Sequence, residues 1–124
     1  MRMNSVALFA LAGSLTLSPA LVLAHHSAAA FDIQQEVKTT GTVTGYRFAN
    51  PHVYLTLQVK RADGSTVSVE VEAGAASVLN GLGVTRTSIA VGDVVTIVGN
   101  PARGNPDKLM LGRISTSATG PTIR

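Results

Sequence analysis

The sequence lacks cysteine altogether and is poor in charge. Its 124 residues include no cysteine, and charged residues make up 14%. The missing cysteine excludes disulfide scaffolds, thiolate zinc sites, iron–sulfur clusters and cysteine nucleophiles. The low charged fraction argues against a protein that is disordered because of its high charge. The chain is also too short for a TIM barrel. We therefore expect a single folded domain.

The first 24 residues have the pattern of a secretory signal peptide. Arg2 is their only charge, the stretch from Val6 to Leu17 is mostly apolar, and the segment ends in small residues. This matches a positive start, an apolar run of about 7–15 residues and a small-residue cleavage site. A membrane span needs roughly 20 apolar residues. We expect cleavage after Ala24, with Ala20 as the competing site, export to the periplasm or the medium, and no stable membrane anchor afterwards.

Cleavage also changes the charge balance. The full chain has 10 Lys and Arg against 7 Asp and Glu, and loss of Arg2 leaves 9 against 7 in the 100 residues of His25–Arg124. The remaining basic residues are scattered, whereas nucleic-acid binding needs them clustered on one face. The sequence therefore predicts that nucleic acid is not a partner.

Two alternating segments predict a β-hairpin. Apolar residues occupy every second position of residues 53–59 and again of 67–71, as in strands with one buried face. Pairing Val59 with Val67 keeps the apolar residues on one face and leaves a three-residue loop, Ala62-Asp63-Gly64. Such loops favour a glycine in the left-handed conformation at the last position, and Gly64 stands there.

Three further strands and one helix complete the predicted order. Segment 37–48 has a strong β composition but needs a bend near Gly45 to keep its apolar residues on one side. Apolar spacing predicts a two-turn helix within residues 74–83. Strands are expected over residues 94–99 and 108–116, with an exposed loop over 100–107 between them.

The order of strand, strand, strand, helix, strand, strand is that of the OB-fold. We predict an all-β protein with one short helix, a small five-stranded OB-like barrel over residues 25–124. Residues 25–36 form its N-terminal arm and residues 117–124 a frayed tail. An open meander and a small sandwich are the alternatives with the same strands.

Five short motifs stand out along the mature chain: His25-His26-Ser27, Phe31-Asp32, Thr40-Gly41-Thr42-Val43, Asn50-Pro51-His52 and the run from Val91 to Ala102. Together they resemble a family of small exported bacterial proteins known as domain of unknown function 6152. The His-His-Ser start with a later Asn-Pro-His is the specific part. The resemblance implies export and a small β fold, and the family supplies no activity to carry over.

All three histidines fall in two places, His25-His26 and His52. After cleavage at Ala24, the free α-amine and the imidazole of His25 would chelate one metal ion, with His26 or His52 as a third nitrogen ligand. Such a nitrogen-rich set favours Cu(II), with Zn(II) second. The alternative is that these histidines are solvated or capping residues with no shared role.

The polar face of the predicted hairpin is the expected binding surface. It carries Tyr54, Thr56, Gln58, Glu70 and Glu72. OB-type barrels bind ligands on the face of their second and third strands. We therefore predict an exported binding module for a periplasmic protein, a glycan or a small molecule, with copper or zinc binding as the alternative. No enzyme is predicted unless a redox metal is bound.

Overall fold

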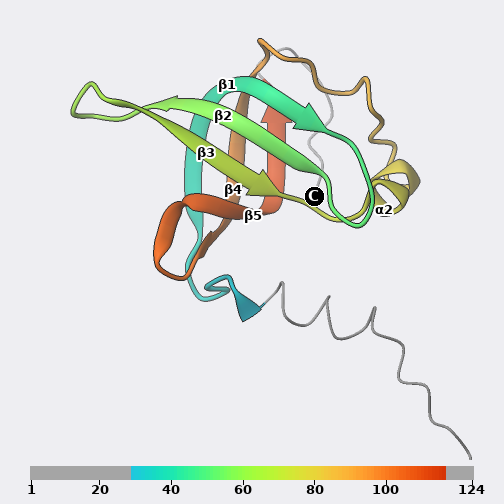
Figure 1. Cartoon of the computed structure of the whole chain (residues 1–124), viewed down its shortest axis with the longest axis horizontal. Helices are drawn as coiled ribbons and strands as arrows, with labels where there is room; N and C mark the ends of the chain where they lie inside the picture. Colours follow the sequence, from blue (N-terminus) through green and yellow to red (C-terminus); the bar gives the residue numbers. More distant parts are fainter. Residues whose placement is uncertain (1–28, 117–124) are drawn as a thin grey trace, which may run out of the picture.

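Within residues 29–116, five strands and one helix follow one another in the order expected from the sequence. The computed structural model describes residues 29–116. The elements are β1 (Val37–Arg47), β2 (Tyr54–Lys60), β3 (Thr66–Glu72), α2 (Ala76–Gly81), β4 (Val94–Ala102) and β5 (Asn105–Thr116). Neighbouring strands run β1-β2-β3-β5-β4, and β4 pairs with β1 to close the barrel (Figure 1). The prediction of a five-stranded OB-like barrel is confirmed.

The central hairpin has the predicted register. Val59 pairs with Val67, and the pairing continues to Tyr54 opposite Glu72. Arg61 N–H donates to the carbonyl of Ser65 at 2.8 Å, which closes the three-residue loop. Gly64 has φ of 86°, the left-handed conformation that this position needs.

The predicted bend in β1 is a β-bulge. The register of β1 against β2 shifts between Val43 and Gly45, so that Thr44 is the extra residue. The bulge lets one long strand pair with two neighbours. Residues 37–42 pair with β4, and residues 42–47 pair with β2. The strand thus turns a corner of the barrel.

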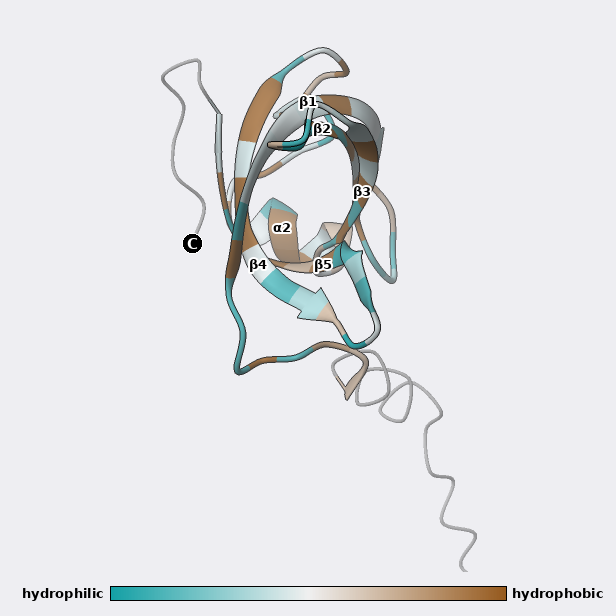
Figure 2. Ribbon diagram, turned by 90° about the vertical axis from the view of Figure 1, so that its left-hand side faces the viewer, coloured by the Kyte–Doolittle hydropathy of each residue, from teal (hydrophilic) through white to brown (hydrophobic). Residues whose placement is uncertain are grey.

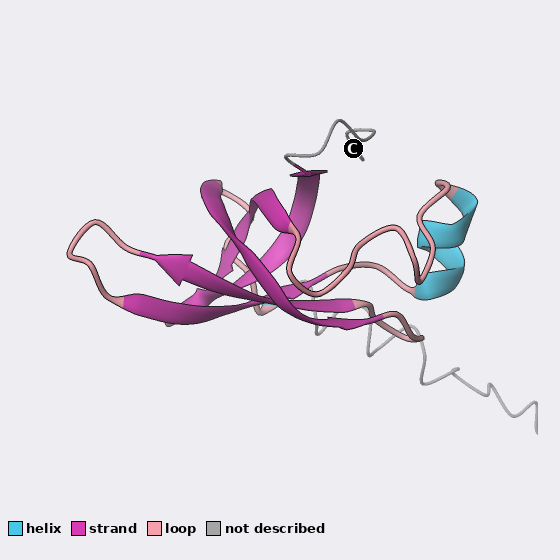
Figure 3. Cartoon of the chain, turned by 90° about the horizontal axis from the view of Figure 1, so that it is seen from above, coloured by secondary structure: helices cyan, strands magenta, loops and turns pink. Residues whose placement is uncertain are grey.

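Two apolar clusters fill the fold. The larger lies inside the barrel and includes Leu57, Val95 and Ile97, which have no exposed surface. The smaller brings Leu79 of α2 against Phe48 and other buried side chains. The helix therefore closes one end of the barrel, and Figure 2 looks along the strands toward it from the opposite end. Figure 3 shows α2 and the tip of the β2–β3 hairpin at opposite ends of the molecule.

The predicted loop over residues 100–107 is wrong in extent. β4 continues to Ala102 and β5 starts at Asn105, so only two residues separate the strands. Phe31, 2% exposed, makes a β-bridge with Ala102, and Asp32 N–H donates to the carbonyl of Pro101 at 2.8 Å. Because Pro101 lies next to a register shift, the sheet tolerates its missing N–H.

Several sequence predictions fall outside the part of the chain that the structure describes. They are the signal segment 1–24, His25 and His26, and the tail 117–124. Within residues 29–116, no helix is long and apolar enough to cross a membrane.

Candidate functional site

The outer face of β2 and β3 carries rows of polar side chains that continue onto the neighbouring strands. The strand pairs place Arg47 of β1 beside Tyr54, and Tyr54 beside Glu72. The next row runs from Gly45 through Thr56 and Glu70 to Lys108 of β5. Because side chains alternate between the two faces of a strand, these rows share the solvent side of the sheet.

A hollow opens on this face beside Tyr54. Its volume is about 440 Å³, and its lining residues are Gly45, Tyr46, Arg47, Tyr54, Thr56 and Glu70. Gly45 helps to form it, since this position carries no side chain opposite Thr56. The Arg47 guanidinium carbon lies 4.8 Å from the centroid of the Tyr54 ring. The hollow therefore combines an aromatic ring with a cation, a hydroxyl and a carboxylate.

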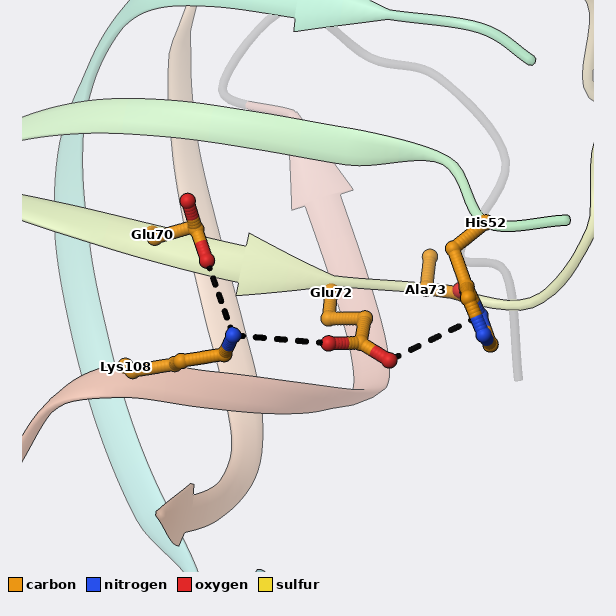
Figure 4. A network of polar contacts seen from close by, with 5 residues as sticks. All are labelled: His52, Glu70, Glu72, Ala73 and Lys108. Carbon is orange, nitrogen blue, oxygen red and sulfur yellow. Dashed lines mark hydrogen bonds and ion pairs between the residues drawn. The ribbon is translucent and has the colours of Figure 1, made fainter. Parts of the chain in front are cut away.

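Next to the hollow, Lys108 links two carboxylates (Figure 4). Its Nζ lies 3.1 Å from Oε1 of Glu70 and 3.6 Å from Oε2 of Glu72. Glu72 is 7% exposed, whereas Glu70 is open to solvent. A buried carboxylate is costly unless it is paired and hydrogen-bonded. Lys108 is thus both a partner of a buried charge and a cation at the edge of the face.

The protonation states of the site follow from these contacts. The hydrogen bond to Glu70 raises the pKa of Lys108, which keeps its ammonium charged. Burial, and next the Glu72 carboxylate, raises the pKa of Tyr54. At neutral pH the face therefore presents a neutral phenol at Tyr54 and a charged ammonium at Lys108.

His52 lies two residues before β2 and is half-buried. Its Nδ1 is 3.2 Å from the carbonyl oxygen of Ala73 and 3.6 Å from Oε1 of Glu72 (Figure 4). Its ring meets Tyr54 edge-on, with centroids 6.3 Å apart. The loop before it is held by Asn50, whose Oδ1 accepts the N–H of Ser77 in α2 at 3.2 Å. Residues 29–116 contain no group of three or more potential metal ligands.

The structure brings together part of the predicted ligand face. Tyr54, Thr56 and Glu70 line the hollow, while Glu72 lies buried beneath Lys108 and Gln58 lies one row farther along β2. Sequence reasoning missed Arg47 and Lys108. Arg47 was predicted within a strand, but its row depends on the bulge at Gly45. Lys108 reaches the face because β5 pairs in parallel with β3. That pairing forms only when the barrel closes.

Exchanging Lys108 for methionine is expected to lower the free energy of unfolding by about 1–2 kcal/mol, because the buried Glu72 carboxylate loses a charged partner. Adding Glu72→Gln to that variant should return part of the loss, since no buried charge then remains. Urea denaturation measures both. Lys60→Met, at an exposed position on the same face, is the control and should change little. Equal losses for Lys108→Met and Lys60→Met would contradict the pairing of Lys108 with Glu72.

Comparison with solved structures defines the class of the fold. The mitochondrial single-stranded DNA-binding protein of S. cerevisiae is 15% identical, with a TM-score of 0.53, and the match covers 69% of this chain and 96% of that one. Its selenomethionine-labelled crystal structure gives 15% identity and a TM-score of 0.50, over 69% and 97%. At such identity the likeness shows the fold alone, an OB-type barrel.

A match to a protein family is more specific than the likeness in fold. The profile of a family of unknown function, DUF6152, matches residues 14–110, most of the chain. The chain belongs to this family, which confirms the resemblance drawn from its motifs. No curated protein matches the sequence.

The prediction that excluded nucleic acid is wrong. Solved neighbours with this barrel are described as single-stranded DNA-binding proteins. The exclusion rested on a net charge averaged over the chain and on basic residues that are scattered in sequence. The fold brings two of them, Arg47 and Lys108, to the face that carries Tyr54. Net charge is therefore no guide to what this face can bind.

Proposed function

We propose that this protein is an exported binding module and that its ligand lies on the outer face of β2 and β3. The hollow beside Tyr54 is the observation that carries the proposal. A binding site on a protein surface typically combines an apolar or aromatic wall with a few placed polar groups. The hollow has both, and it lies on the strands that OB-type barrels use for ligands.

The balance of charge around the hollow favours a neutral glycan chain. Two cations, Arg47 and Lys108, and two carboxylates, Glu70 and Glu72, lie in and beside the hollow, so their formal charges cancel there. A sugar ring stacks on an aromatic side chain and uses its hydroxyl groups as donors and acceptors. Glu70 would accept hydrogen bonds from those hydroxyls, and Arg47 and Thr56 would donate to them.

Single-stranded nucleic acid is the second candidate. The solved neighbours described as DNA-binding proteins favour it, as does the stacking of a cation on Tyr54. Proteins that bind single strands stack bases on aromatic rings and hold the phosphates with cations. Tyr54 would take one base, while Arg47 and Lys108 would face the backbone.

Titration with neutral oligosaccharides and with a thymidine oligonucleotide separates the two candidates. For the glycan, we expect an affinity that changes little between about 50 and 200 mM salt, since no counterions are released. For the nucleic acid, affinity falls steeply over the same range. Salt-sensitive binding of the oligonucleotide, with no binding of the oligosaccharides, would contradict the first candidate and establish the second.

We also propose export with cleavage after Ala24, and a Cu(II) or Zn(II) site that includes the new N-terminus. His52 supports the metal proposal, because an Nδ1–H that donates to Ala73 leaves Nε2 with the free lone pair that a metal needs.

Intact mass of protein recovered from the periplasm should correspond to a chain that starts at His25. Cu(II) should bind that protein more tightly than a variant with one extra N-terminal residue. Equal affinities would contradict chelation by the α-amine.

A further inference from the structure

The end of the barrel opposite α2 is open on two sides of the hairpin. Pairs between β1 and β2 begin at Thr42 and Gln58, and pairs between β3 and β5 begin at Glu70 and Lys108. The outer part of the β2–β3 hairpin therefore extends past the barrel wall, as Figures 1 and 3 show. The ion pair between Arg61 and Asp107 joins this hairpin to β5.

An apolar groove of about 310 Å³ lies between the hairpin and the starts of β1 and β5. Its apolar lining consists of Val37, Val59, Val67, Val69, Pro101, Pro106 and Leu109. Val59, Val69 and Leu109 also belong to the main core, and Val37 at the mouth is 38% exposed. An apolar ligand in this groove would extend the core outward.

The polar side chains around the groove carry a net positive charge. The polar residues that line it are Gln35, Lys38, Thr39, Arg61 and Asp107, and Arg61 and Asp107 neutralise each other. Lys38 is exposed and makes no ion pair within residues 29–116. Lys38 thus adds one unpaired cation to a mostly apolar groove, which complements a ligand with an anionic head and an alkyl tail.

We propose that this groove binds an unbranched medium-chain carboxylate. The alkyl chain lies against Val67, Val69 and Leu109, and the carboxylate pairs with Lys38. The volume suits such a ligand, because it stands at the lower end of the roughly 300–1,000 Å³ that small-molecule pockets occupy. This site is separate from the hollow beside Tyr54, so the two proposals fail or hold independently.

Titration of the protein, expressed from the full sequence, with decanoate below its micelle concentration tests the proposal. We expect saturable binding of one molecule, with methyl NMR shifts at Val67, Val69 and Leu109. Each methylene removed should weaken binding about fourfold, so octanoate should bind roughly fifteenfold more weakly. Decyltrimethylammonium, with the same chain and a positive head, should bind more weakly than decanoate. No saturable binding, or shifts at other methyl groups only, would overturn the proposal.

Charge variants test the assigned head-group contact. Lys38→Glu should weaken decanoate binding about fivefold or more, as expected for a reversed charge at an exposed pair. Lys60→Glu makes the same change at an exposed residue that does not line the groove, and it should leave the affinity unchanged. Equal affinities of the two variants would refute the role of Lys38. Tyr54→Ala should leave decanoate binding intact, which separates this site from the face of β2 and β3.

Discussion

Replacing Gly99 with alanine is expected to lower the free energy of unfolding by about 3 kcal/mol, at the upper end of the cost of overpacking. A Cβ at this position would clash with the carbonyl oxygen of Met110 and lie 3.2 Å from its carbonyl carbon. Both atoms belong to the backbone of the paired strand, so no side-chain rotation relieves the contact. β4 and β5 would have to separate at this point of their pairing.

Thermal unfolding measures this effect, and Gly45→Ala is the matched control. Gly45 also lies in a strand beside a register shift, but its Cβ would meet Thr56 at 3.4 Å, an ordinary contact. For a domain of this size, 3 kcal/mol corresponds to a loss of roughly 15 °C in Tm. The Gly45 variant should stay within a few degrees of the original protein. Similar Tm values for the two variants would contradict the close approach of β4 and β5.

The second large effect concerns the ligand. Tyr54→Ala should weaken binding about 10- to 100-fold, because stacking on one aromatic ring contributes about 1–3 kcal/mol. Tyr54→Phe keeps the ring and should bind within about twofold of the original protein. Calorimetric titration with whichever probe binds the original protein gives both values. If the alanine variant binds as well as the phenylalanine variant, Tyr54 is not the stacking platform.

The hairpin could be predicted to the residue because two independent constraints agreed there. Alternating valines allowed one register, and Gly64 fitted the loop that this register leaves. The bend in β1 was predictable for a similar reason, since the apolar residues change parity near Gly45. The local sequence pattern is enough to predict the register where two paired strands are adjacent in sequence.

The region around Pro101 and Pro106 could not be predicted in this way. Two prolines and several turn-forming residues are typical of a loop, yet the strands run through them. Phe31, about 70 residues earlier, covers Ala102 and supplies the missing pairing. Distant contacts of this kind leave no periodic signal in either segment, so propensity gave the wrong boundary.

In the candidate site, too, some residues follow from the local sequence pattern and others depend on distant contacts. Tyr54, Thr56 and Glu70 share a face by alternation alone and were predictable. Arg47 and Lys108 join them through the bulge and through barrel closure, which depend on the whole fold. The error about nucleic acid had this cause: basic residues that are scattered along the sequence come to lie on one face of a closed sheet.

We propose above that the ligand lies on the outer face of β2 and β3. Amide NMR spectra recorded during titration, with whichever of the two probes binds more tightly, test it most directly. We expect the largest shifts at Gly45, Arg47, Tyr54, Thr56 and Glu70, which line the hollow. Shifts confined to the outer face of β1 and β4, where Thr40 and Thr96 share a hydrogen bond, would contradict it.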